Sequence, residues 1–173
     1  MMIWINGAFG SGKSTTAEEL HRCLPDSFVY DPEQAGYFIR QNTPGRLHLP
    51  DFQDDPLWRS INGSLLSRIA REYTGTILIP MTIVNRDYWD ELVGGLRRQT
   101  IDVRCFTLSA SRETLLQRLR SRGEDEHSWS AGRIDECVSA LSVSEFGLPI
   151  VTDDLSPEAV AERIAAECGL VLV

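Results

Sequence analysis

The sequence of 173 residues is poor in cysteine and histidine, and neither residue type is clustered. The cysteines form no Cys-x-x-Cys pair, and the histidines are scattered along the chain. Disulfide frameworks and structural metal centres need such residues at short, regular spacing. The residues concerned are Cys23, Cys105, Cys137, Cys168, His21, His48 and His127. We therefore expect reduced structural thiols and no metal centre made of cysteine and histidine.

Long hydrophobic runs and an excess of positive charge are also missing. No run approaches the ~20 apolar residues of a membrane span, and the first residues lack the basic start and apolar stretch of a signal peptide. Lys and Arg number 17 against 25 Asp and Glu, which gives a net charge of −8. Nucleic acids and anionic membranes are bound through basic surfaces. We therefore expect a cytoplasmic protein with no integral membrane segment and no general affinity for nucleic acid.

Five short apolar segments alternate with helical patterns along the chain. The strands are expected at residues 3–5, 28–30, 77–84, 101–108 and 150–152, and the helices at 13–24, 33–41, 111–122 and 157–168. This alternation predicts βαβ units, and therefore an α/β fold with a five-stranded parallel sheet and helices on both faces. Without a repeat or a linker, residues 1–173 are expected to form a single domain. Pro80 predicts a bend or an early end of the third strand, because proline has no N–H for a ladder.

One motif indicates the class of protein. Residues 7–14, GAFGSGKS, fit G-x-x-x-x-G-K-[ST] and stand between a predicted strand and a predicted helix. Glycines let main-chain N–H groups face one concavity, and the helix start adds the positive end of its dipole. Lys13 can reach the β and γ phosphates, and the Ser14 hydroxyl can bind Mg²⁺. The predicted nucleotide site consists of Gly7, Ala8, Phe9, Gly10, Ser11, Gly12, Lys13, Ser14 and Thr15.

Several other classes of P-loop protein lack their signatures in this sequence. It has no Asn-Lys-x-Asp guanine signature, and the chain is too short for most motor or helicase domains. The third predicted strand ends Ile-Pro-Met-Thr, without the Asp or Glu that holds the metal in many nucleotide hydrolases. The pattern therefore favours a small-molecule kinase.

Asp31 and a pair of arginines are the candidate catalytic residues beside Lys13. Asp31 follows the second predicted strand, where a carboxylate can accept a proton from an acceptor hydroxyl or help to hold Mg²⁺. It can also serve only as a turn residue before Pro32. Arg118 and Arg122 share a face of a predicted helix, and can neutralise the γ-phosphoryl group in the transition state. Residues 118–133 would then form a lid that excludes water, unless these arginines only pair with acidic residues in solvent.

Further segments resemble the ATP-binding tunicamycin-resistance proteins (TmrB type). The similarity covers residues 2–168 in colinear order, and its segments are IWINGAFGSGK (3–13), YDPE (30–33), PLWR (56–59), IPMTIV (79–84), RLRSR (118–122), SW (128–129) and ID (134–135). The resemblance implies a three-layer P-loop kinase-like fold, of the nucleoside-monophosphate kinase type and related to chloramphenicol phosphotransferase. It also implies ATP as the nucleotide and resistance to tunicamycin, a nucleoside antibiotic that carries uridine, amino sugars and a fatty acyl chain. Pro80 then is a feature of the family.

In the implied fold, residues 33–73 cover the small-molecule acceptor. Within them, Arg40, Trp58 and Arg59 are the candidate acceptor contacts, because aromatic rings stack on bases and arginine pairs with polar groups. Aromatic residues at helical spacing can equally belong to the core. Three functions stay open: a kinase for a nucleoside antibiotic, a kinase for another small hydroxylated metabolite, and a nucleotide-regulated protein that sequesters a drug. Nothing in the sequence indicates an oligomeric state.

Overall fold

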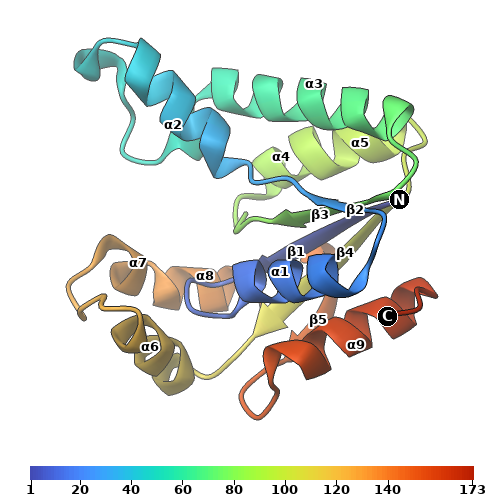
Figure 1. The fold of residues 1–173 in the computed structure, drawn as a ribbon. Helices are drawn as coiled ribbons and strands as arrows, with labels where there is room; N and C mark the ends of the chain where they lie inside the picture. Colours follow the sequence, from blue (N-terminus) through green and yellow to red (C-terminus); the bar gives the residue numbers. More distant parts are fainter.

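A computed structural model describes residues 1–173, apart from the side chain of Ser144. Its strands form one parallel sheet in the order β2-β3-β1-β4-β5, which confirms the expected α/β fold (Figure 1). The strands are β1 (Met2–Gly7), β2 (Ser27–Val29), β3 (Thr76–Pro80), β4 (Val103–Ser109) and β5 (Leu148–Val151).

Helices cover both faces of this sheet (Figure 1). On one face lie α2 (Glu33–Asn42), α3 (Pro56–Glu72), α4 (Arg86–Trp89), the π-helical η3 (Asp90–Gly94) and α5 (Gly95–Arg98). The other face carries α1 (Lys13–Cys23) and α9 (Pro157–Cys168). The remaining helices are α6 (Arg112–Ser121), α7 (Trp129–Gly132), α8 (Ile134–Ala140) and the 3₁₀ turns η1 (Gly45–Leu47), η2 (Phe52–Asp54) and η4 (Ser144–Phe146). A small core that includes Ala8 joins α6, α7 and α8 to the loop after β1.

The central strand β1 supplies both main cores through alternate residues. Met2 and Trp4 pack into the core beneath α3 and η3, whereas Ile3 and Ile5 pack into the core beneath α1 and α9. All four are fully buried. Successive strand residues point to opposite faces, so a continuous apolar run is what a sheet covered on both sides requires.

Pro80 is the last residue of β3, and its missing N–H costs no ladder bond. The N–H groups of Ile77 and Met81 donate to carbonyl groups of Met1 and Ile5, on the β1 side of the strand. Because the N–H groups of successive strand residues point to opposite sides, the nitrogen of Pro80 faces β2. The β2–β3 ladder ends at Val29 and Leu78, and Pro80 lies beyond that end. An early strand end therefore explains this proline.

The predicted strand 77–84 is consequently too long. Beyond β3, the chain is held by side chains at the end of β1 rather than by a ladder. The Asn6 side chain accepts a hydrogen bond from the N–H of Ile83 (3.0 Å) and donates one to its carbonyl (2.9 Å). The Thr82 hydroxyl donates to the carbonyl of Gly7 (2.7 Å). These bonds place residues 82–83 beside the loop that follows β1.

Side-chain caps mark the starts of the longest helices. The Asp55 carboxylate accepts from the N–H of Leu57 (2.8 Å) at the start of α3, and the Ser156 hydroxyl accepts from the N–H of Ala159 (3.3 Å) at the start of α9. Both helices have proline at the first turn, and α9 covers the predicted residues 157–168. Of the helices described, none has the length and apolar character that crossing a bilayer requires.

Candidate active site

The loop between β1 and α1 has the backbone shape of a phosphate cradle. Gly10 (φ 82°) and Gly12 (φ 97°) adopt left-handed conformations, and a Cβ on Gly10 would lie 2.7 Å from the carbonyl oxygen of Leu115. Only glycine fits this position without a shift of α6. No side chain caps the start of α1, so its first N–H groups face outward for an anion.

Of two polar groups in this loop, the Lys13 ammonium fits a bound phosphate. The Lys13 ammonium donates to the carbonyl of Ala8 (3.0 Å), and burial lowers the pKa of Lys13 to about 8, while the nearby Cys137 and Glu33 oppose that shift. The Ser11 hydroxyl is buried and has no hydrogen-bond partner among the described residues. Phosphate oxygens would pair with the Lys13 ammonium, which lines the cavity, whereas the Ser11 hydroxyl lies beside Gly7, away from it. The residues present therefore fit a nucleoside triphosphate.

The largest cavity of the site, here the main cavity, opens beside this loop with a volume of ≈680 Å³. It lies at the carboxyl ends of β1, β2 and β3, where α/β proteins bind ligands. Five segments supply residues that line it. They lie within residues 9–18 (the loop and α1), 29–40 (β2 and α2), 50–53 (around η2), 80–82 (the end of β3 and the residues after it) and 119–130 (from α6 to α7). Phe9, Gly10, Lys13 and Ser14 of the predicted nucleotide residues line it, and the others complete the loop behind them.

Asp31 lines the main cavity and also holds the start of α2. Its two carboxylate oxygens accept hydrogen bonds from the N–H of Glu33 (2.9 Å) and from the side-chain amide of Gln34 (2.8 Å). Asp31 is thus a turn residue whose carboxylate also lines the cavity, and its role in proton transfer or Mg²⁺ binding stays a prediction.

Glu33 is a site residue that sequence reasoning missed. It lines the main cavity, where burial and the charge of Asp31 raise the pKa of its carboxyl group, while Lys13 opposes the shift. The hydroxyl of Tyr37 donates to it (3.2 Å). The sequence placed it two positions after Asp31 and within the family segment YDPE, but acidic residues are common at helix starts for electrostatic reasons alone.

The two arginines of the predicted lid, Arg118 and Arg122, lie in separate places. Arg122 lines the main cavity and is close enough to lower the pKa of Lys13. Arg118 instead donates to the hydroxyl (3.0 Å) and the carbonyl (2.6 Å) of Thr152, in the loop after β5. The structure therefore does not bring Arg118 to the phosphate end of the cavity, because these two bonds direct its guanidinium to the loop.

The predicted acceptor contacts are also divided. Trp58 is fully buried, donates to the carbonyl of Pro32 (2.9 Å) and packs against Phe52 at 5.4 Å between ring centroids. The prediction that Trp58 contacts the acceptor is corrected, because the ring belongs to the core. Arg40 lines the main cavity, and its guanidinium donates to the carbonyl groups of residues 49 and 50 (3.0 Å each).

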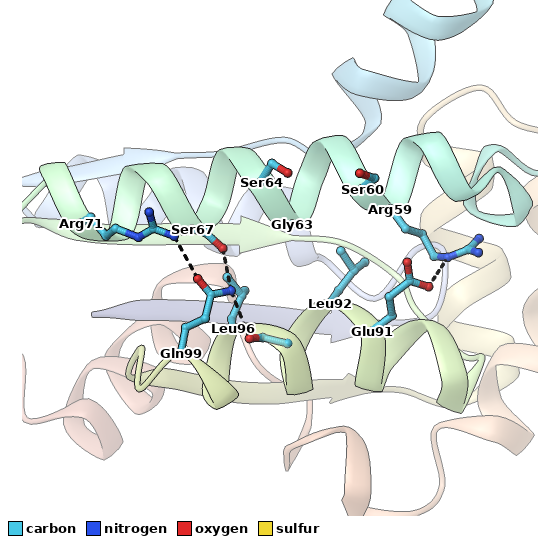
Figure 2. Close-up of a pocket in the computed structure, with 11 residues that line it drawn as sticks. Arg59, Ser60, Gly63, Ser64, Ser67, Arg71, Glu91, Leu92, Leu96 and Gln99 are labelled. Carbon is cyan, nitrogen blue, oxygen red and sulfur yellow. Dashed lines mark hydrogen bonds and ion pairs between the residues drawn. The ribbon is translucent and has the colours of Figure 1, made fainter.

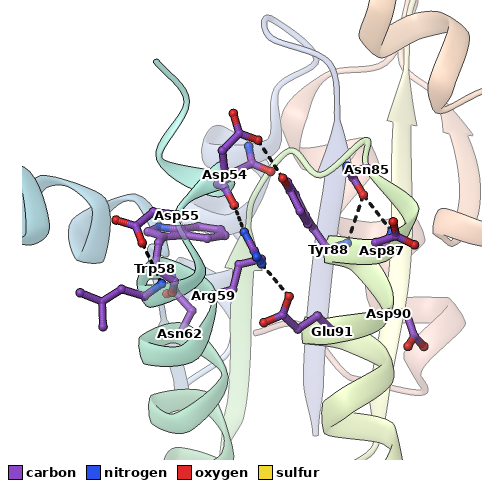
Figure 3. A network of polar contacts seen from close by, with 12 residues as sticks. Asp54, Asp55, Trp58, Arg59, Asn62, Asn85, Asp87, Tyr88, Asp90 and Glu91 are labelled. Atoms are coloured by element: carbon purple, nitrogen blue, oxygen red, sulfur yellow. Dashed lines mark hydrogen bonds and ion pairs between the residues drawn. The ribbon is translucent and has the colours of Figure 1, made fainter. Parts of the chain in front are cut away.

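Arg59 lies outside the main cavity, in a network that ties α3 to α4 and η3 (Figure 3). Its guanidinium pairs with Glu91 (2.6 Å), donates to the carbonyl of Gln53 (2.5 Å) and stacks on Tyr88 (4.2 Å to the ring centroid). The hydroxyl of Tyr88 donates to Asp54 (2.9 Å). The structure thus makes Arg59 a support for η2, which lines the cavity, rather than a direct contact.

A second hollow of ≈570 Å³ lies between α3 and the segment η3–α5 (Figure 2). Small polar residues of α3 form one wall, and the Gln99 amide bridges to the Ser67 hydroxyl (3.0 Å) and accepts from Arg71 (3.1 Å). None of its lining residues belongs to the phosphate loop. The candidate active site is therefore the main cavity.

Comparisons with known proteins agree with this geometry. The model of the AAA domain family matches residues 2–143. The structure of the tunicamycin resistance protein of Deinococcus radiodurans is 35% identical over 99% of this chain and 98% of that one, with a TM-score of 0.84. Two less similar structures share the fold. A gluconokinase from Sinorhizobium meliloti is 15% identical over 97% of this chain and 91% of that one, with a TM-score of 0.68. The APS kinase of Mycobacterium tuberculosis is 16% identical over 97% of this chain and 96% of that one, with a TM-score of 0.65. Among curated proteins, no sequence matches this chain.

Proposed function

Because the chain belongs to the tunicamycin-resistance proteins and to the wider AAA domain family, we propose that it is a Mg²⁺-dependent kinase. It would transfer the γ-phosphoryl group of ATP to a hydroxyl of tunicamycin or a similar nucleoside antibiotic. One observation carries the proposal. A single cavity joins the phosphate cradle with Lys13 to two carboxylates, Asp31 and Glu33, on the acceptor side.

In this proposal the nucleotide is held by the loop 7–14 and the start of α1. The main-chain N–H groups and Lys13 would bind the β and γ phosphates. The Ser14 hydroxyl and Asp31 are oxygen ligands of the type that Mg²⁺ prefers. When bound, Mg²⁺ would neutralise negative charge on the phosphates.

Asp31 would orient the acceptor hydroxyl and accept its proton. As the new O–P bond forms, the bond between the γ-phosphorus and the ADP oxygen breaks and the acceptor O–H bond gives up its proton. The two hydrogen bonds from the start of α2 hold the Asp31 carboxylate in place for this step. Arg122 would offset charge on the transferring group.

Residues 33–73 would cover the acceptor and residues 118–133 would form the lid. An ion pair between Asp51 and Arg133 (3.4 Å) joins the two segments. Tyr37 and Phe52 give the cavity aromatic walls, and Tyr37 is 45% exposed. Such a surface suits an acceptor with a flat ring and an apolar chain.

Residues 80–82 favour one alternative, a protein that sequesters the drug. Thr82 and Met81 line the cavity after β3, where many P-loop enzymes have a metal-binding carboxylate. Such a protein would bind nucleotide and drug without chemistry.

Mass spectrometry of the drug separates these functions. After incubation of the protein with Mg·ATP and tunicamycin, a kinase yields drug that is heavier by about 80 Da, the mass of an added phosphoryl group. The Lys13→Met variant should yield none. The Arg104→Met variant loses one exposed positive charge near the start of β4 and should retain activity. Unmodified drug in the presence of tight binding would favour sequestration and contradict the kinase.

A further inference from the structure

Gln53 is an unpartnered polar residue in the wall of the main cavity. It lies in η2, lines the cavity and is only 9% exposed. No hydrogen bond joins its side-chain amide to any residue that the structure describes, although the neighbouring Asp51 and Asp54 carboxylates both accept hydrogen bonds. The amide nitrogen and oxygen are not among the buried polar atoms that lack a partner, so they are accessible and can bind a molecule in the cavity.

The backbone of Gln53 is fixed from two sides. Its N–H donates to the Asp51 carboxylate (2.9 Å), and its carbonyl accepts from Arg59 (2.5 Å). Arg59 is itself held by Glu91 and Tyr88 (Figure 3). A side chain on such a support is presented in a defined place, which favours selective binding.

The surroundings of Gln53 are aromatic and mostly acidic. The neighbouring Phe52 ring lines the same cavity and lies 6.4 Å from the Tyr37 ring, centroid to centroid, at an interplanar angle of 70°. Carboxylates of Asp31, Glu33 and Asp51 also line the cavity. The two arginines near this end are already engaged: Arg40 donates to backbone carbonyl groups and lies over the Phe52 ring, and Arg133 pairs with Asp51.

We propose that Gln53 determines acceptor specificity by reading the amide edge of a planar, uncharged ring. A carboxamide places a C=O acceptor beside an N–H donor, which is complementary to a neighbouring N–H and C=O such as those of a pyrimidine imide. The exposed Tyr37 ring would stack on the ligand ring, and Phe52, inclined to Tyr37 by 70°, would contact the edge of the ligand ring. A phosphate or carboxylate on the acceptor would meet the three carboxylates instead. The inference rests on the proposed function for its acceptor hydroxyl, and it disfavours sugar acids and nucleotides as acceptors.

Calorimetric titration tests this inference without any phosphoryl transfer. The probes are uridine, 3-methyluridine (whose imide N–H is blocked) and uridine 5′-monophosphate, each added to the full chain with Mg·ADP. We expect uridine to bind at least about tenfold more tightly than either of the others. Equal binding of uridine and 3-methyluridine, tighter binding of the monophosphate, or no binding of uridine would overturn the proposal.

Two variants assign the effect to Gln53. Gln53→Met removes both the C=O acceptor and the N–H donor at nearly constant size, and it should reduce the preference for uridine over 3-methyluridine to less than about twofold. Gln117→Met, on the exposed surface of α6, should keep that preference. A preference that survives in the folded Gln53→Met variant overturns the assignment. This experiment measures binding and not phosphoryl transfer. If the protein prefers uridine over 3-methyluridine but leaves tunicamycin unmodified, the proposed kinase activity is refuted and the role of Gln53 is not.

Discussion

The hydroxyl of Thr82 donates a 2.7 Å hydrogen bond to the carbonyl of Gly7, the first residue of the phosphate loop. Thr82 is buried and stands just after β3, where many P-loop enzymes have a carboxylate that serves the metal. In this chain the position supports the loop itself. Nucleotide affinity should therefore depend on a threonine that need not touch the nucleotide.

Thr82→Val should weaken ATP binding about fivefold, because the loop loses a buried bond worth about 1 kcal/mol. The matched control is Thr107→Val, which removes a buried 3.0 Å bond from Thr107 to the carbonyl of Phe146 on the other side of the sheet centre. Both variants should lose similar stability in thermal unfolding. Equal ATP affinities in the two variants would refute the role of Thr82.

The depressed pKa of Lys13 predicts a pH dependence of nucleotide binding. Burial lowers this pKa from 10.5 to about 8, so the free protein loses the ammonium charge as the pH rises through about 8. ATP affinity, measured by calorimetry between pH 7 and 9, should fall over that range. Lys13→Arg keeps its charge and should give a flat profile. A wild-type profile as flat as that of Lys13→Arg contradicts the prediction.

The same shift has a consequence for stability. Between about 8 and 10.5 the unfolded chain still binds a proton at Lys13 that the folded chain has released. The contribution of Lys13 to the free energy of unfolding therefore increases with pH across this window. In denaturant unfolding, the free energy of unfolding of the wild type should therefore rise with pH relative to that of Lys13→Met. A relative fall with pH would show that the folded ammonium is not desolvated.

Asp31 and Glu33 are distinguished by conservative amide variants. Asp31→Asn should reduce turnover by about 10²–10⁴-fold while ATP binding persists, because the proton acceptor is lost. Glu33→Gln should reduce turnover less than about tenfold. Since Glu33 raises the pKa of Lys13, its removal should also move the midpoint of ATP binding to lower pH. A larger loss of turnover in Glu33→Gln than in Asp31→Asn would show that Glu33, and not Asp31, accepts the proton of the acceptor hydroxyl.

The parts of this site that lie close together in sequence could be predicted, and the others could not. Residues 7–14 form one contiguous loop, so spacing alone identified the phosphate cradle. Arg118 takes its direction from Thr152, 34 positions away, and Trp58 is buried against the carbonyl of Pro32. Neither contact leaves a local pattern. Gln53 is a single amide in a segment rich in aspartate and proline, and only its place in the cavity wall identifies it.

Trp129 offers an optical signal for the proposed closure of residues 118–133 over the nucleotide. Its ring lies edge-on to Phe9 of the phosphate loop, with 5.1 Å between centroids, and it is 52% exposed, whereas Trp4, Trp58 and Trp89 are buried. Nucleotide binding draws Lys13, 5.6 Å from the Phe9 centroid, toward phosphate and alters the surroundings of this pair. Tryptophan emission should therefore change on addition of Mg·ATP in the wild type and stay constant in Trp129→Phe. An equal change in both proteins would show that the signal comes from the buried tryptophans. It would contradict the prediction that nucleotide binding alters the contact between Trp129 and the phosphate loop.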